Sequence, residues 1–165
     1  MVLEYADGGT LNNYLGNEFS SLSWQDKFRL AFQLSSAVEC LHEEGIIHGD
    51  LHSNNVLIFQ DSIKLTDFGL SKRIEDKTTE VVSRLYGVIP YIDPRAFKIL
   101  GKDYDLNMKS DVYSVSILLW ELSSGKRPFA RYKYDSSLVM KIEQGLRENI
   151  EEGTPEEYSN LYTSK

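Results

Sequence analysis

Residues 48–69 have the sequence HGDLHSNNVLIFQDSIKLTDFG. It contains two short apolar runs, at residues 56–59 and 63–65, separated by a polar turn. Such runs on either side of a turn are typical of a β-hairpin. The two ends of the hairpin carry Asn55 and Asp67, so the hairpin would fix the distance between these polar side chains.

The polar residues around this hairpin form a set that is suited to phosphate chemistry. Asp50 can accept a proton from a hydroxyl nucleophile. Asn55 and Asp67 offer the hard oxygen ligands that Mg²⁺ prefers when substrate phosphates fill its remaining positions. One Asp or Asn in a turn more often serves the turn itself. The three residues together favour a magnesium-phosphate site.

Length and composition predict one globular domain with a core of its own, because 41% of the 165 residues are hydrophobic. There are 18 Lys and Arg against 25 Asp and Glu, a net charge of -7, so neither nucleic acid nor a membrane is an expected partner. The longest apolar stretch, residues 115–122, is too short to span a bilayer, and no secretory signal opens the chain. We expect an intracellular, cytoplasmic location.

The single cysteine, Cys40, supports the same expectation. One cysteine excludes an intrachain disulfide and suits a reducing compartment. Cys40 lies within a helical pattern, where we expect it to be a buried, small apolar residue.

The rest of the chain predicts mostly helices. Apolar residues recur at helical spacing in several segments, and most of these segments begin with residues that cap a helix N-terminus. The expected helices cover residues 11–15, 23–45 with the capping box of Ser23 and Asp26, a short segment from Asp93 and Pro94, 110–122 capped by Ser110 and Asp111, 136–144, and 154 onward. The helix over 110–122 is apolar on all sides, which is typical of a buried helix. Residues 1–5 read as a strand and residues 70–92 as a loop. We predict an α+β fold that is mainly α with short β-hairpins.

Several motifs occur together in this order. They are H-x-D-L-x-x-x-N at 48–55, D-F-G at 67–69, S-D-V-Y-S at 110–114 and W-E at 120–121. Their combination resembles the catalytic core of eukaryotic protein kinases. The resemblance implies ATP and Mg²⁺ as cofactors, a protein substrate that is phosphorylated on Ser or Thr, with Tyr as the alternative, and a role in signalling. It also implies that residues 1–165 form a partial kinase domain with the protein-kinase-like fold. This part would consist of the hinge strand and the large C-terminal lobe, without the small N-terminal lobe and the last helices of the large lobe.

The resemblance also implies roles for individual residues. Asp50 would be the catalytic base, with His52 and Asn55 beside it as further catalytic residues. Asn55 and Asp67 would be the Mg²⁺ ligands. The remaining expected roles are Leu57 as the apolar floor beneath adenine, Glu4 and Ala6 as backbone partners of adenine at the hinge, a stack of His48 on Phe68, and Asp111 as a support of the catalytic-loop backbone.

Some positions depart from the kinase pattern. Gly49 stands where an arginine usually receives a phosphorylated activation loop, so phosphorylation of that loop is not expected to act through this position. His52 stands where a lysine is common, and histidine is only partly charged at neutral pH. The other departures are Val88 in place of Thr and Asp93-Pro94-Arg95 in place of Ala-Pro-Glu.

The sequence contains neither a G-x-G-x-x-G loop nor a V-A-I-K lysine, so we expect a fragment in which half of the nucleotide cleft is missing. Three hypotheses stay open: a protein kinase domain that is active when complete, a binding module that docks on another kinase or a scaffold, and a fragment that does not fold alone. Within the kinases, the motifs look like the tyrosine-kinase-like group, and the stretch 52–55 like a fungal set of Ser/Thr kinases.

Overall fold

The structure of the chain is a computed structural model that describes residues 7–74, 88–97 and 106–163. The strand expected at residues 1–5 lies outside these residues. The helices are α1 Leu11–Glu18, α2 Trp24–Glu43, α3 Pro94–Phe97, α4 Met108–Ser124, α5 Ser136–Glu143 and α6 Glu156–Thr163. The strands are β1 Ile46–Ile47, β2 Val56–Phe59, β3 Ser62–Leu65 and β4 Lys72–Arg73, and the short 3-10 helices are η1 Phe19–Ser21, η2 Phe68–Leu70 and η3 Ile89–Tyr91. The expected architecture, mainly helical with short hairpins, is confirmed.

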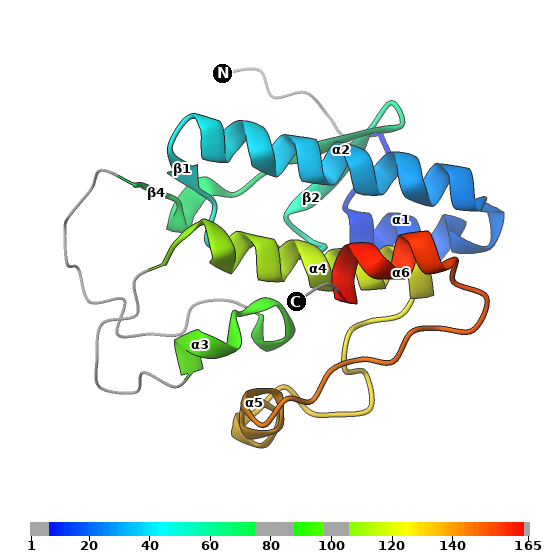
Figure 1. The fold of residues 1–165 in the computed structure, drawn as a ribbon. Helices are drawn as coiled ribbons and strands as arrows, with labels where there is room; N and C mark the ends of the chain where they lie inside the picture. Colours follow the sequence, from blue (N-terminus) through cyan, green and yellow to red (C-terminus); the bar gives the residue numbers. More distant parts are fainter. Residues whose placement is uncertain (1–6, 75–87, 98–105, 164–165) are drawn as a thin grey trace.

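The two long helices α2 and α4 form the centre of the fold. They lie one above the other in Figure 1, and α6 lies against α4, while β3 packs on α2. A separate small cluster joins α3 to α5 at the lower edge of Figure 1. Leu11, Leu34, Leu118 and Leu122 are fully buried in the main core. No helix in the described ranges is long and apolar enough to span a lipid bilayer.

The predicted start of α2 is confirmed. Ser23 is the N-cap residue, its hydroxyl accepts a hydrogen bond from the Asp26 N–H at 3.2 Å, and the Asp26 carboxylate accepts one from the Ser23 N–H at 3.1 Å. This reciprocal pair is a capping box. At the other end, Gly45 takes a φ of +69°, which favours glycine at the position after a helix.

The expected burial of Cys40 is wrong, because Cys40 is exposed on α2. In this part of α2, Leu34 and Val38 face the core. Cys40 follows Val38 by two positions, about 200° around the helix, so it lies on the other side. Its presence in a helical pattern did not define its face.

The predicted start of α4 is also wrong. Asn107 is the N-cap residue, and Ser110 completes a capping box by accepting a hydrogen bond from the Asn107 N–H at 3.2 Å. Asp111 therefore lies inside the first turn rather than capping the helix. Most of α4 is buried, as expected from its composition, although Val112 is 58% exposed.

The hairpin of β2 and β3 has the predicted form. Val56 pairs with Leu65, and Phe59 pairs with Ser62, which leaves a turn of two residues. The turn residues Gln60 and Asp61 have φ of +46° and +57°. Positive φ at both positions matches the twist of the flanking strands.

Residues 70–92, expected to be irregular, contain short regular elements. β4 pairs with β1 in an antiparallel register, with Ile46 opposite Arg73 and Ile47 opposite Lys72. Further on, η3 lies directly before α3, and α3 begins at Pro94 after Asp93, as predicted. β4 was not predicted, because its partner β1 lies about 25 residues earlier and such a pairing leaves no pattern in the local sequence.

The end of α4 offers a test of the packing. Gly125 has a φ of +64°, and a β-carbon there would lie 2.4 Å from the ring of Phe19. The ring is held by the Lys27 ammonium, 3.8 Å from its centroid. We expect Gly125→Ala to lower the free energy of unfolding in urea by about 2 kcal/mol or more, through backbone strain and overpacking.

Gly16 provides the matched control for this test. It lies within α1, and a β-carbon added there meets nothing within 4 Å. Gly16→Ala should raise the free energy of unfolding by about 0.5–1 kcal/mol, because alanine is the better helix former. Equal effects at the two positions would contradict the packing described for Gly125.

Candidate active site

The loop at residues 48–55 joins β1 to β2 and carries the predicted catalytic residues. Its last turn is closed by a hydrogen bond from the Asn55 N–H to the His52 carbonyl at 2.8 Å. The Asn55 side chain then turns back along the loop, where its Nδ2 donates to the Asp50 carbonyl at 2.8 Å and to Asp50 Oδ2 at 3.3 Å. The structure therefore brings Asp50 and Asn55 together.

His52 faces the same oxygen of the Asp50 carboxylate as Asn55 does. Its Nδ1 accepts a hydrogen bond from the Asn54 N–H at 3.3 Å, so the hydrogen of the neutral ring is on Nε2. Nε2 is 3.8 Å from Asp50 Oδ2. Asp50 keeps 17% of its side chain exposed, so the carboxylate is oriented by its neighbours and still reachable.

Asp67 follows the second strand of the hairpin and lies close to Asn55 in the backbone. The Thr66 N–H donates to the Asn55 carbonyl at 3.0 Å. Asp67 itself is exposed and has a left-handed φ of +62°, and its carboxylate accepts a hydrogen bond from the Gly69 N–H at 3.3 Å. The hairpin places the two residues side by side, but no direct contact joins their side chains.

The donor chemistry of this pair fits a magnesium ion that is shared with phosphates. Because Asn55 Nδ2 faces two acceptors of Asp50, its Oδ1 is the atom left for a cation. Mg²⁺ commonly takes one or two protein oxygens and completes its shell with phosphates and water. In the part of the chain that the structure describes, no group of three or more His, Cys, Asp or Glu is placed to hold a metal.

Asp111 fixes the start of the loop, as predicted. It is 1% exposed, and its carboxylate accepts hydrogen bonds at 2.9 Å from the N–H groups of His48 and Gly49. His42, at the end of α2, adds a third hydrogen bond through Nε2 at 2.9 Å. The contribution of His42 was not predicted, since only its place in the last turn of a helix was visible.

The predicted contact between the rings of His48 and Phe68 is present, with centroids 5.0 Å apart, but the rings are tilted by 44° rather than stacked in parallel. His48 is fully buried, and its Nδ1 accepts from the Asp50 N–H at 3.3 Å while Nε2 donates to the Thr66 carbonyl at 3.1 Å. His48 thus links the catalytic loop to the residue before Asp67.

A family model described as protein tyrosine and serine/threonine kinase matches residues 1–164. The chain belongs to this protein kinase family. A probable serine/threonine-protein kinase of Dictyostelium discoideum is 30% identical over 98% of the chain, and stress-activated protein kinase alpha of the same organism is 32% identical over 98%. The leaf rust 10 disease-resistance locus receptor-like protein kinase-like 1.4 of Arabidopsis thaliana is 34% identical over 90%.

The chain spans only 20%, 27% and 23% of the length of these three relatives. They come from Dictyostelium discoideum and Arabidopsis thaliana, so they do not bear on the likeness to fungal kinases. The match therefore shows that the chain is a protein kinase by family, but it does not show the role of any single residue.

Gly49 departs from the kinase pattern for a visible reason. Its φ is +79°, and a β-carbon would lie 3.1 Å from the Leu70 carbonyl oxygen and 2.5 Å from a methyl group of Leu106. A side chain here would be strained. Thr78, Thr79 and Ser83, the hydroxyl residues of the expected activation loop whose phosphorylation is not expected to act through Gly49, lie outside the described residues.

A series of buried, hydrogen-bonded polar side chains, here called the buried polar chain, connects the loop at residues 48–55 to α4. The Tyr91 hydroxyl donates to Glu121 Oε2 at 2.7 Å and lies 3.2 Å from the Ser53 hydroxyl. The three residues are 6%, 3% and 5% exposed, respectively. Burial raises the pKa of Glu121, and the hydrogen bond from Tyr91 opposes this shift. Sequence reasoning missed this chain, because its members lie on three separate segments.

Glu121 makes stability depend on pH. Since the pKa of Glu121 is raised in the folded state, ionisation costs more there than in the unfolded chain, and stability falls as the pH rises from the usual glutamate pKa of about 4.3 through the raised value. Glu121→Gln keeps an oxygen for the Tyr91 hydroxyl and cannot ionise. We expect its free energy of unfolding, measured in urea across this range, to lack that decline. As a control, replacing the exposed Glu152 with glutamine should leave this decline with pH in place. If the free energy of unfolding changed with pH in the same way for wild type and Glu121→Gln, Glu121 would not be the source of the decline.

The expected nucleotide side is described only in part. Leu57 is half-buried in β2, with Val56 and Ile58 buried on either side of it. The segment after the hinge lies along the same strand, because the Gly8 N–H donates to the Ile58 carbonyl at 3.1 Å and the Ile58 N–H donates to the Gly9 carbonyl at 2.9 Å. The hinge residues Glu4 and Ala6 lie outside the described residues.

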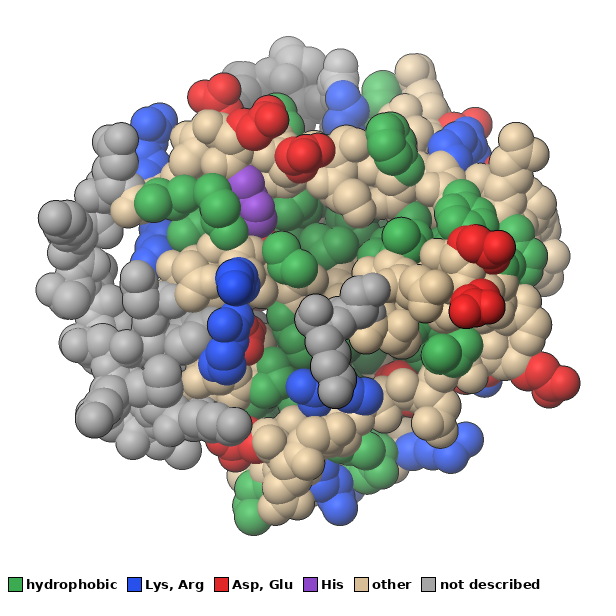
Figure 2. Space-filling view, viewed as in Figure 1, with side chains coloured by type: hydrophobic (Ala, Val, Ile, Leu, Met, Phe, Trp, Pro, Cys, Tyr) green, Lys and Arg blue, Asp and Glu red, His purple; other side chains and the backbone are tan. Residues whose placement is uncertain are grey.

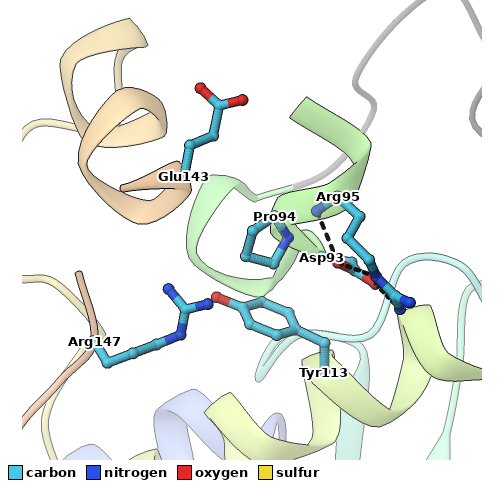
Figure 3. Close-up of a pocket in the computed structure, with 6 residues that line it drawn as sticks. All are labelled: Asp93, Pro94, Arg95, Tyr113, Glu143 and Arg147. Carbon is cyan, nitrogen blue, oxygen red and sulfur yellow. Dashed lines mark hydrogen bonds and ion pairs between the residues drawn. The ribbon is translucent and has the colours of Figure 1, made fainter. Parts of the chain in front are cut away.

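A pocket of about 330 Å³ lies apart from the catalytic loop, among α3, α4 and the end of α5 (Figure 3). Figure 3 shows the hydrogen bonds between Arg95 and Asp93. Arg147 lies beside the ring of Tyr113, and Glu143 lies across the pocket from Tyr113. Arg95 stands where kinases commonly have a glutamate, and here it forms an ion pair with Asp93, two positions earlier in the chain. None of the predicted catalytic residues lines this pocket.

Proposed function

We propose that this chain supplies the catalytic loop of an enzyme that transfers the γ-phosphoryl group of ATP to hydroxyl groups of a protein substrate. The observation that carries the proposal is the Asp50 carboxylate, which is oriented by Asn55 Nδ2 at 3.3 Å and faced by His52 Nε2 at 3.8 Å. A carboxylate that is positioned but still partly exposed suits a general base for a hydroxyl nucleophile.

The residues of the loop then have separate tasks. Asp50 accepts the proton of the substrate hydroxyl as this oxygen attacks phosphorus. Asn55 orients the carboxylate, and His52 holds a hydrogen-bond donor, positively charged when protonated, next to it. Asp111 acts through the loop backbone and is a positioning residue. Leu57, together with the backbone of Glu4 and Ala6, would hold the adenine.

Mg²⁺ fits the same arrangement. Asn55 Oδ1 and the Asp67 carboxylate would hold the ion, which supplies neutralisation of the charge on the phosphates. Asp67 now bonds to the Gly69 N–H, so its side chain must turn toward Asn55 when the ion binds. An exposed residue can make this change of rotamer at little cost.

We assign the substrate hydroxyl to Ser or Thr, because the relatives include proteins named serine/threonine-protein kinases. The S-D-V-Y-S and W-E motifs, together with the loop sequence, support a place among tyrosine-kinase-like Ser/Thr kinases, with signalling as the setting. An ATP-dependent enzyme of this kind, with one exposed thiol, suits the interior of the cell.

A second function is a binding module that docks on another kinase or a scaffold. In that case the exposed surfaces of the helices would carry the function.

The test is Mg²⁺-dependent transfer of labelled γ-phosphate to Ser-containing peptides, using the protein expressed from its full coding sequence. We expect Asp50→Asn to lower kcat by about 10²–10⁴-fold, as is typical when a general base is removed. Asp61→Asn is the matched control, because Asp61 lies in the exposed hairpin turn and asparagine tolerates the same φ. Equal rates for wild type and Asp50→Asn would reject the proposal in favour of the binding module.

A further inference from the structure

The connection between α4 and α5 is strongly basic in an otherwise acidic chain. Within residues 126–133, which we call the basic loop, four side chains are positive and none is negative, whereas the whole chain has a net charge of -7. The connection is the yellow segment of Figure 1, and in Figure 2 several Lys and Arg side chains lie in the lower part of the face, around α5 and this segment. The four residues are Lys126, Arg127, Arg131 and Lys133, and all are exposed.

Arg127 differs from an ordinary surface arginine because its guanidinium group is fixed. Its Cζ lies 4.1 Å from the centroid of the Tyr134 ring, and its Nε donates to the Tyr134 hydroxyl at 3.0 Å. This hydroxyl in turn donates to the Pro128 carbonyl. The stacked and hydrogen-bonded group has already lost much of its side-chain freedom, so binding an anion costs less entropy.

The outer edge of this group is available to a ligand. Only Nε of Arg127 donates a hydrogen bond within the described part of the chain, which leaves the Nη groups. Those groups match the two oxygens of a carboxylate or a phosphate. Lys126 is different, since its ammonium group pairs with Glu151 at 2.6 Å.

The basic loop adjoins the catalytic loop through the buried polar chain. Glu121 lies in the last turn of α4, and the basic loop begins two residues after α4 ends. Glu121 accepts the hydrogen bond of Tyr91, and the Tyr91 ring lies 6.0 Å from that of His52. The basic loop therefore starts beside the part of α4 that is linked to the loop at residues 48–55.

We propose that Arg127, with Arg131 and Lys133, selects protein substrates that carry an anionic group near the acceptor hydroxyl. This inference rests on the proposed function and names its substrate class. The anion is a carboxylate of Asp or Glu or the phosphate of a previously phosphorylated residue, since both have the planar pair of oxygens or the charge that a fixed guanidinium recognises.

The first test is a binding measurement that does not need phosphoryl transfer. Asp50→Asn protein, expressed from the full coding sequence, is titrated against fluorescent Ser peptides flanked by Ala, Glu, phosphoserine or Lys, and anisotropy is followed. We expect the Glu or phosphoserine peptide to bind about tenfold more tightly than the Ala peptide, which is the size of one or two charge-assisted hydrogen bonds. The two anionic peptides distinguish carboxylate from phosphate as the preferred group.

Matched variants assign the effect to Arg127. In the Asp50→Asn background, Arg127→Gln should remove most of the preference, and Arg127→Glu should transfer it to the Lys peptide. Lys126→Gln removes the same charge from the neighbouring residue and should leave the preference unchanged. Equal losses for Arg127→Gln and Lys126→Gln would mean a general charge effect, and equally tight binding of a single-stranded oligonucleotide would mean a general polyanion site; either result overturns the proposal.

Kinetics then separate this inference from the proposed function. With Asp50 intact, Arg127→Gln should raise KM for the anionic peptide about tenfold and leave kcat, and the KM of the Ala peptide, nearly unchanged. Charge-dependent binding without any transfer would reject the proposed function and retain the anion site. Transfer with the same KM for anionic and Ala peptides would do the reverse.

Discussion

Replacing Asp111 with alanine is expected to lower the free energy of unfolding by about 3–5 kcal/mol and to abolish phosphoryl transfer with it. The carboxylate is 1% exposed and accepts hydrogen bonds from the N–H groups of His48 and Gly49 and from His42 Nε2. Alanine would leave the buried His48 N–H and the partly buried Gly49 N–H and His42 Nε2 without this partner, and a buried unpaired donor costs about 1–3 kcal/mol. The catalytic loop would lose its fixed start, so Asp50 would lose its position as well.

Urea unfolding of the variant tests this expectation, and a second aspartate at a helix start is the control. Asp135 is the N-cap residue of α5, is exposed, and accepts a hydrogen bond from the Ser137 N–H at 2.9 Å. Asp135→Ala should cost only about 1 kcal/mol, the usual value for a lost cap. If Asp111→Ala cost no more than Asp135→Ala, Asp111 would be an ordinary helix-start residue.

The polypeptide of residues 1–165, expressed by itself, is expected to show no phosphoryl transfer above that of its Asp50→Asn variant. Catalysis in this family is largely positioning and electrostatic stabilisation. The 165 residues include the catalytic loop but neither a Gly-rich loop nor a V-A-I-K lysine to hold the phosphates in line. We therefore expect weak nucleotide binding without chemistry, a loss of several orders of magnitude in rate.

The measurement is Mg²⁺-dependent transfer of labelled γ-phosphate to a generic Ser peptide, after cooperative unfolding in urea has established that the polypeptide is folded. Turnover approaching the roughly 1–100 s⁻¹ of kinases would contradict the expectation. If phosphoryl transfer appeared only after a separately expressed kinase small lobe was added, the result would favour an incomplete kinase over the binding module.

Local signals predicted the elements whose causes are themselves local. The capping box of Ser23 and Asp26 and the two-residue turn between β2 and β3 depend on neighbours within a few positions. The start of α4 was misplaced for the same reason. Asn107 and Ser110 are both good caps, and only the structure shows that Ser110 serves as the second half of the box of Asn107.

The site was predicted where a motif has fixed spacing and missed where contacts are distant in the chain. Asp50 and Asn55 are five positions apart, and the loop geometry brings them together. His42 and Asp111 are 69 positions apart, and Tyr91 and Glu121 are 30 apart, so nothing in the sequence around either pair predicts the contact. The burial of a single residue was equally hard to read, as Val112 shows by being exposed on a mostly buried helix.

The exposed thiol of Cys40 has a practical consequence. It is the one cysteine of the 165 residues, so a maleimide dye or a spin label attaches to α2 at a single position without mutagenesis. A second label on the basic loop would then report the approach of a partner as a change in one distance. The same exposed thiol is open to intermolecular disulfide formation when reductant is omitted, and such dimers would imitate self-association in sizing experiments.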